Sequence, residues 1–253
     1  MIKTSEEIKI MAEGGRILAQ IIKELEKMIE PGVVTKELDK ATEGLVLRYG
    51  AECSFKNYTG PDDEFSEPFP SCLITSINEE VVHGIPSDRI LKNGDIVSLD
   101  LGIKYKGFHT DMAVTIPIGI VNAEALKLIR VTKTALKKGI KTVKHGNTIG
   151  DIGNAVQKYT ESNGFSVVQD LCGHGIGKNI HEDPQILNYG KKRTGLKLIE
   201  GMTFCIEPML TLGNGYIKKS SNGHCFETQD GFLSAHFEHT IAVTKNGYRI
   251  LTL

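Results

Sequence analysis

Apolar residues recur at helical spacing through the first stretch of the chain. Between residues 4 and 29 the repeat consists of Ile8, Met11, Leu18, Ile22, Leu25 and Ile29, the pattern of one buried helix face. Thr4 and Glu7 have the spacing of a capping box, so we expect the helix to begin at Thr4. A Pro-Gly pair at 31–32 ends it, and a second helix is predicted from Thr35 to about Gly50.

The same order of elements returns in the second part of the chain. A helix is predicted from about Asn122, the segment "HGNT" interrupts it, and Thr148 begins another helix that ends near Gly164. Strand-like segments follow each pair of helices. We therefore predict an α+β fold in which residues 1–253 form a single domain built from two related halves, about 1–118 and 119–253. A site between the halves is the natural expectation.

Four strand-like segments alternate apolar and polar side chains, and each carries an acidic residue on its polar side. Successive side chains of a strand point to opposite faces. If the apolar faces pack on the helices, the four carboxylates therefore point to one common surface. These residues are Asp100 in "IVSLDLG", Asp111 in "HTDMAVTIP", Glu207 in "GMTFCIEPML" and Glu238 in "AHFEHTIAV".

The first two of these segments form a predicted hairpin. A turn centred on Tyr105 and Lys106 would place Asp100 directly opposite Asp111, with Cβ atoms about 5 Å apart. A bulge at Gly107 is the alternative, and it would shift the pairing by one residue.

Carboxylates that converge on one surface repel one another, at a cost of several kcal/mol for a pair about 4 Å apart in a partly buried site. Protons or cations must relieve this repulsion, unless the acids are scattered over ordinary solvent-exposed surface. Cations are favoured because His174 supplies a nitrogen ligand within the segment "CGHGIG". Such an oxygen-rich set without thiolate suits Mn²⁺, Fe²⁺ or Co²⁺ and, less strictly, Zn²⁺. Four acids exceed the need of one divalent ion, so two ions that activate a shared water are expected.

Glycines cluster around that histidine in "LCGHGIGKNIHEDPQ", residues 171–185. The spacing matches neither a dinucleotide fingerprint nor a Walker loop, and His181 lacks the second histidine of a zinc-protease helix. We interpret the glycines as positions where backbone approaches a metal ion closely.

Composition narrows the class of protein. A net charge of −1 argues against general nucleic-acid binding, and no apolar run reaches the length of a membrane span. The five cysteines, an odd number without a C-x-x-C motif, argue against a disulfide framework and for a reducing compartment.

Five motifs together resemble methionine aminopeptidase of type I, and they cover nearly the whole chain. The resemblance implies the pseudo-two-fold pita-bread fold, with antiparallel sheets and helices packed on the outer face. It also implies removal of the initiator methionine from nascent proteins, with a dinuclear metal-bound hydroxide as the nucleophile. The motifs are "NEEVVHGIP" (78–86), "LDLGIKYKGFHTD" (99–111), "CGHGIGKNIHEDPQILNYG" (172–190), "GMTFCIEPM" (201–209) and "LSAHFEHTIAVT" (233–244).

The resemblance assigns roles to matching residues. It implies that Asp100 binds one metal ion, that His174 and Glu207 bind the other, and that Asp111 and Glu238 bridge both. The metal itself stays open among Co, Mn, Fe and Zn. Three catalytic residues are implied: His83 and His181 contact the substrate near the scissile amide, and Glu207 takes a proton from the attacking water. Four further histidines, namely His109, His145, His236 and His239, are expected to be structural.

The pocket for the methionine side chain departs from the family pattern. Our candidates for its apolar wall are Tyr58, Phe69, Ile74 and Ile180. The loop at 59–68 is longer than usual in the family. The chain has no tryptophan, and His224 or Phe226 is expected at the place of the usual pocket tryptophan.

Two other functions stay open at this point. A peptidase of the same fold that cleaves before proline, or its creatine-hydrolysing relative, would carry an additional N-terminal domain. A metal-free binding module would have lost ligands, whereas all five are present. The interval from Glu207 to Glu238 is too short for the insertion of type II enzymes. We therefore expect a bacterial-type cytoplasmic enzyme.

Its expected partners are nascent polypeptide N-termini. The basic stretch from Lys133 to Lys144 is a candidate contact with the ribosome, although a solvated helix face explains the same charges. We expect a monomer without membrane association or specific nucleic-acid binding.

Overall fold

Four helices form where the sequence pattern predicts them. The computed structural model describes residues 2–60 and 67–253, in which the helices are α1 (Ser5–Glu26), α2 (Thr35–Arg48), α3 (Ala123–Ile140) and α4 (Ile149–Ser162). Thr4 caps α1 through the predicted capping box with Glu7. Asn122 caps α3 by accepting the Ala125 N–H. The helix α1 ends at Glu26, three residues before the last apolar position of the predicted repeat.

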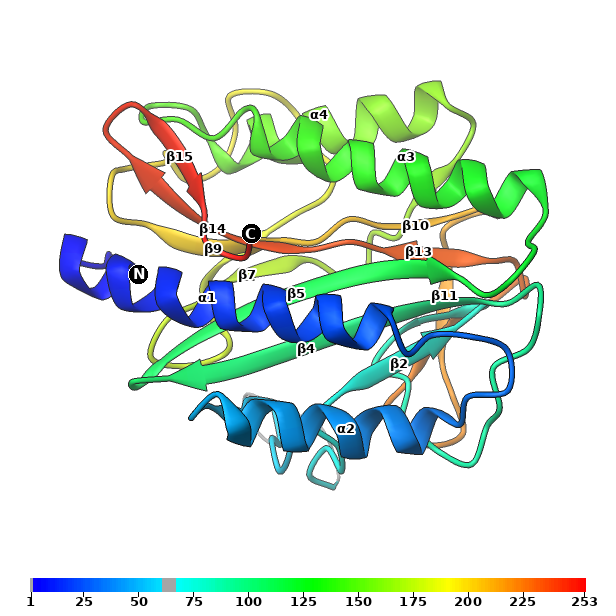
Figure 1. Ribbon diagram of the computed structural model, residues 1–253. Coiled ribbons are helices and arrows are strands. Elements are labelled where there is room, and N and C mark those ends of the chain that lie inside the picture. The colour runs from blue at the N-terminus through cyan, green and yellow to red at the C-terminus, as the bar shows by residue number, and fades with distance from the viewer. Residues whose placement is uncertain (1, 61–66) are drawn as a thin grey trace.

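Short antiparallel strands make up four sheets between the helices. In Figure 1, α1 lies in front of β4 and β5, and α3 and α4 lie at the top, above β10 and β13. In the sheet with the longest strands, β4 pairs with β5 along one edge and with β2 and β1 along the other. A second sheet has the order β15-β14-β9-β7-β8. The strands are β1 (Glu52–Cys53), β2 (Ile74–Ile77), β3 (Glu80–Val82), β4 (Ile96–Tyr105), β5 (Phe108–Pro117), β6 (Ser166–Val167), β7 (Gly173–Gly175), β8 (Glu182–Ile186), β9 (Thr203–Ile206), β10 (Met209–Thr211), β11 (Ile217–Lys219), β12 (Phe226–Thr228), β13 (Ser234–His236), β14 (His239–Thr244) and β15 (Gly247–Ile250).

The hairpin of β4 and β5 differs in register from the prediction. Its turn consists of Lys106 and Gly107, which both have positive φ angles, 48° and 85°, as the common two-residue hairpin turn requires. Asp111 therefore faces Gly102, and Asp100 faces Ala113. The predicted direct pairing of the two aspartates is wrong by two positions. Because strand side chains alternate with a period of two, both aspartates still point to the same face.

The apolar faces of the strands pack on the helices, as the alternation predicts. The main hydrophobic cluster joins Leu18 and Ile22 of α1 to Leu99 of β4 and Val114 of β5. Phe204 of β9 belongs to the same cluster and is fully buried. The acidic residues of these strands consequently lie on the opposite face, away from the helices.

Hydrogen bonds join the two halves along β5. The N–H of Asp111 donates to Oγ1 of Thr240 at 2.8 Å, and the N–H of Glu238 donates to the carbonyl oxygen of Ala113 at 2.9 Å. Thr115 Oγ1 donates to the His236 carbonyl at 2.8 Å. These contacts place the acidic face of the first half beside residues 236–240 of the second.

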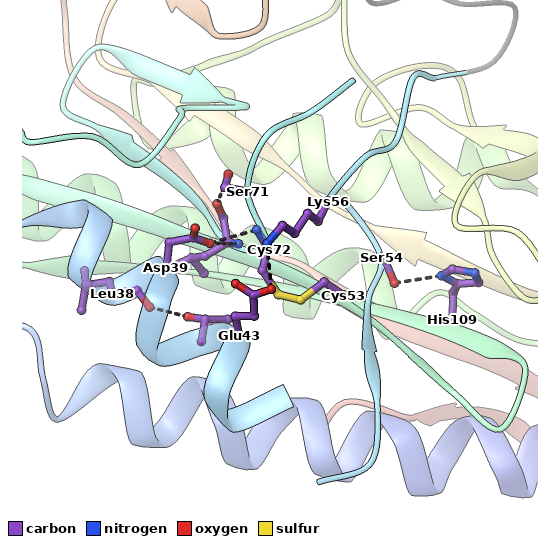
Figure 2. Close-up of a disulfide and its surroundings, with 11 residues drawn as sticks. Leu38, Asp39, Glu43, Cys53, Ser54, Lys56, Ser71, Cys72 and His109 are labelled. Atoms are coloured by element: carbon purple, nitrogen blue, oxygen red, sulfur yellow. Dashed lines mark hydrogen bonds and ion pairs between the residues drawn. A yellow bond between two sulfur atoms is a disulfide. The ribbon is translucent and has the colours of Figure 1, made fainter. Parts of the chain in front are cut away.

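A disulfide joins Cys53 to Cys72 across a sequence separation of 19 residues (Figure 2). Asp39 of α2 accepts the N–H groups of Cys72 and Leu73, both at 2.9 Å. The disulfide thus joins the two residues that flank segment 54–71, next to the hydrogen bonds with Asp39 of α2.

This disulfide corrects the expectation drawn from the cysteine count. The odd total leaves three free thiols, at Cys172, Cys205 and Cys225. The count excludes full pairing but cannot exclude one bridge between residues that the fold brings together. Among the described residues, no helix combines the length and the apolarity that a membrane span requires.

Candidate active site

A cavity of about 510 Å³ lies where the acidic faces of both halves meet. It receives all five predicted metal ligands and both predicted catalytic histidines. Three of the four predicted apolar wall residues line it as well. These lining residues are Asp100, Asp111, His174, Glu207 and Glu238, then His83 and His181, and finally Tyr58, Phe69 and Ile74.

Glu238 lies at the centre of the polar groups. Its carboxylate belongs to three sets of candidate ligand atoms within 4.8 Å of one another. One set adds Asp100 and Asp111, so it joins β4 and β5 of the first half to the second half. The others are Glu207 with His236, and His174 with Cys205. All these side chains are buried or nearly so.

Burial raises the pKa values of these carboxyl groups. The pKa of Asp111 rises to about 7, because desolvation outweighs the hydrogen bonds that it accepts. Desolvation, followed by repulsion from neighbouring carboxylates, raises the pKa of Asp100, Glu207 and Glu238 well above the usual range.

Divalent cations fit this donor set. Oδ1 of Asp100, Oε1 of Glu238 and Nε2 of His236 are buried and have no hydrogen-bond partner within the described residues. Native proteins rarely leave such groups unsatisfied. Bound cations would satisfy these atoms and relieve the repulsion between the carboxylates.

His174 presents a lone pair to this cluster. Its Nδ1 lies 2.9 Å from the carbonyl oxygen of Gly175, which can only accept, so Nδ1 carries the proton. Its Nε2 lies 3.4 Å from Oε1 of Glu207. Burial lowers the His174 pKa to about 4. The imidazole is therefore neutral, the form that binds metal ions.

His181 contacts the ring of His174 at the cavity. Its ring is perpendicular to that of His174, with centroids 4.4 Å apart. Its Nδ1 lies 2.7 Å from the hydroxyl of Tyr58. Desolvation first, and then the neighbouring histidines, lowers the pKa of His181. A neutral imidazole in this position can donate to or accept from a substrate.

His83 occupies an unusual backbone conformation at the cavity wall. Its φ angle is 59°, and its ring makes an edge contact with Phe226 at 5.9 Å. A Cβ on the following Gly84 would lie 2.2 Å from the Thr75 carbonyl oxygen, so only glycine fits there. Non-glycine residues with positive φ concentrate at functional sites.

The glycines around His174 serve the packing of the chain. A Cβ at Gly173 would meet the Cys205 carbonyl, and one at Gly175 would meet the Asp183 carbonyl. A Cβ at Gly177 would meet the side chain of Lys3. The close approaches that the structure shows are to neighbouring strands and to Lys3, and an approach of this backbone to a metal ion stays a prediction.

The structure also adds residues to the site that the sequence interpretation left out. His236 was assigned a structural role, but its Nε2 lies 3.7 Å from Glu207 and 4.0 Å from Glu238. Its position two residues before Glu238 in an alternating segment already placed both side chains on one face. Phe55 lines the cavity, and Cys205 lies in the same strand-like segment as Glu207, two residues before it.

The apolar wall agrees with the prediction only in part. Ile180 is buried in the cluster with Phe55 and Phe69 and does not line the cavity. His224 makes an edge contact with Phe69 at 5.5 Å. Of the long loop at 59–68, residues 61–66 lie outside the described residues.

Comparisons with known proteins match this arrangement over the whole chain. A profile of metallopeptidase family M24 matches residues 9–245. Methionine aminopeptidase 1 of Bacillus subtilis (strain 168) is 45% identical over 250 residues, which cover 99% of this chain and 98% of that protein. A crystal structure of methionine aminopeptidase from Rickettsia prowazekii has a TM-score of 0.95 at 40% identity, with 100% of this chain and 99% of that chain covered.

A more distant likeness confirms the pita-bread fold. The prolidase of Pyrococcus horikoshii OT3 has a TM-score of 0.79 at 25% identity. The similarity covers 100% of this chain but 63% of the prolidase chain.

Proposed function

This chain belongs to metallopeptidase family M24 and, within it, to the methionine aminopeptidases, and we propose that it removes the initiator methionine from nascent polypeptides with two divalent metal ions. The proposal is supported chiefly by the convergence of five metal-ligand side chains from both halves on one buried cavity. Residues 1–253 would act as one catalytic unit, and the two halves would each supply part of the ligand set.

The carboxylates and His174 would hold the ions. Asp100 would bind one ion, His174 and Glu207 the other, and Asp111 and Glu238 would bridge the two. Bound divalent ions supply a Lewis acid for the scissile carbonyl and lower the pKa of an attacking water. Co, Mn, Fe and Zn all suit these ligands.

The remaining polar groups would act on protons and on the substrate. Glu207 lies beside the candidate ligands, and we assign to it the acceptance of a proton from the attacking water. His83 and His181 would contact the substrate near the scissile amide and stabilise the charge that develops on its oxygen. The Tyr58 hydroxyl, 2.7 Å from His181 Nδ1, fixes the orientation of that imidazole.

An apolar pocket beside these groups would receive the methionine side chain. Phe55, Tyr58, Phe69 and Ile74 line this part of the cavity. Burying an unbranched thioether chain against such a wall contributes roughly 1.5–3 kcal/mol of binding free energy. We further propose that the chain acts as a cytoplasmic monomer and that the basic face of α3 contacts the ribosome.

Hydrolysis of Met-Ala-Ser beside Ala-Pro-Ala tests the function. The chelated protein should release no amino acid, and Mn²⁺ or Co²⁺ should restore release of methionine from the first peptide only. Cleavage of Ala-Pro-Ala instead would move the chain to a prolidase-like specificity.

Replacing His181 tests its assignment as a residue that is not a ligand. We expect His181→Ala to lower kcat by roughly 100-fold, while the metal content stays at the wild-type value. Loss of bound metal in this variant would make His181 a ligand and contradict its assigned role.

A further inference from the structure

Lys3 and Glu182 form an ion pair that is almost removed from solvent. Lys3 Nζ lies 2.8 Å from Glu182 Oε2, and the two side chains are 6% and 14% exposed. The other carboxylate oxygen of Glu182 accepts the N–H of Asn179 at 3.2 Å. The pair formed by Lys106 and Glu13 has a similar distance, 2.9 Å, but its side chains are 55% and 43% exposed. Burial of two charges is costly, so such a pair needs an explanation beyond stability.

The backbone fixes the lysine end of this pair. The N–H of Lys3 donates to the carbonyl oxygen of Gly201 at 2.7 Å, and Ile2 forms an antiparallel bridge with Met202. Met202 directly precedes β9, whose first residue is Thr203. The backbone of Lys3 is therefore anchored beside the sheet that also carries β7 and β8.

The segment 177–182 folds around the lysine side chain. A Cβ on Gly177 would lie 2.0 Å from Cε of Lys3, so the aliphatic part of the lysine passes directly over that glycine. Gly177 also donates to the Asn179 carbonyl at 3.1 Å. Lys3 therefore contacts this segment at both ends, at Gly177 and at Glu182.

His181 depends on the backbone of this segment. It lies within the segment 177–182, directly before Glu182, the first residue of β8. Its neighbours in the cavity, Tyr58 and His174, come from other segments and contact its ring. We propose that the Lys3–Glu182 ion pair is a positioning device that holds His181 in the cavity, an inference that rests on the proposed function for its catalytic consequence.

Turnover of Met-Ala-Ser tests the coupling between the ion pair and His181. Lys3→Met removes the ammonium group but keeps an unbranched chain over Gly177. We expect kcat to fall about tenfold, since loss of orientation alone has effects of this order, with KM and metal content within about twofold of wild type. In a His181→Ala background the same substitution should change kcat less than about twofold, because both changes act through one imidazole.

Two further variants serve as controls for this test. Lys106→Met removes the exposed pair of similar length and should leave kcat unchanged. Lys3→Met/Glu182→Gln also replaces the carboxylate by a neutral amide, so it guards against loss of folding, and it should show the same tenfold loss of kcat. A tenfold loss that persists in the His181→Ala background would overturn the proposal.

Hydrogen exchange tests the positioning itself without reference to activity. The amides of residues 178–182 should exchange at least about tenfold faster in Lys3→Met than in wild type or in Lys106→Met. Unchanged exchange in this segment would overturn the proposal whatever the peptides show. Faster exchange together with a wild-type protein that releases no methionine would refute the proposed function and leave the positioning role standing.

Discussion

His236 lies with its Nε2 3.7 Å from Oε2 of Glu207 and 4.0 Å from Oε2 of Glu238. Burial, followed by repulsion from His83, lowers its pKa to about 3, so the ring is neutral beside two carboxylates. At the residue scale, alternation along the segment placed His236 and Glu238 on one face, but it could not show which groups of other strands they meet. The carboxylates were predictable because four of them recur in one pattern; a single histidine carries no such repetition.

We predict that His236 contributes to metal binding. His236→Gln should weaken the affinity for Mn²⁺ or Co²⁺ about tenfold, the lower end of the effect of removing groups that support metal ligands. Titration calorimetry of the chelated protein measures this affinity. His239→Gln is the matched control, because His239 lies on the other face and bonds Thr252 at 2.9 Å. Equal metal affinities of His236→Gln and His239→Gln would show that His236 has a structural role and does not contribute to metal binding.

At the scale of elements, alternation predicts faces but not registers. The two-residue turn at Lys106 and Gly107 moves Asp111 two positions along β4 from the predicted pairing. A shift of two keeps every side chain on its face, so the sequence pattern is equally compatible with either register. The Cys53–Cys72 bridge was missed for a related reason: one residue lies in β1 and the other just before β2. These strands meet only because both pair with β4.

We predict that this disulfide stabilises the protein and shapes the pocket. Closing a loop of this length contributes about 3 kcal/mol through the unfolded chain, and reduction should remove that contribution from the unfolding free energy. The bridged segment carries Phe55, Tyr58 and Phe69 of the apolar wall, so KM for Met-Ala-Ser should rise while metal content stays constant. A Cys53→Ser/Cys72→Ser variant should behave like reduced wild type and be insensitive to reductant. Five titratable thiols in the unreduced protein would contradict the bridge.

At the scale of the whole molecule, the site exists only because distant segments meet. Asp100 and Asp111 come from the first half, Glu207 and Glu238 from the second, and hydrogen bonds between β5 and residues 236–240 bring them together. The duplicated order of elements and the motifs predicted this convergence. The Lys3–Glu182 pair joins residues 179 positions apart, and nothing in local composition marks such a contact.

Convergence of buried carboxyl groups makes stability depend on pH and on metal together. The pKa of Asp111 is about 7 in the folded, metal-free protein and about 3.9 in an unfolded chain. Between about pH 4 and pH 7 the unfolded chain therefore loses this proton first, so the contribution of Asp111 to the stability of the metal-free fold falls as pH rises. Asp100, Glu207 and Glu238 act in the same direction, since their pKa values are also raised.

Divalent ions bind the ionised carboxylates, so they should reverse this dependence. We predict that saturating Mn²⁺ raises Tm more at pH 8 than at pH 5. The buried histidines, whose pKa values are lowered, act in the opposite direction on the metal-free fold up to about pH 6.5, so we expect Tm of the chelated protein to fall only above about pH 7. Asp111→Asn isolates one carboxyl group, because the amide does not titrate. Without metal, the Tm of this variant relative to that of wild type should rise from pH 5 to pH 8. Calorimetry in buffers of different ionisation enthalpy should also detect protons released on Mn²⁺ binding near pH 6. If the difference in Tm between Asp111→Asn and wild type stays constant over this range, Asp111 is ionised and satisfied without metal, and the cavity lacks the driving force for cation binding on which the two-ion site depends.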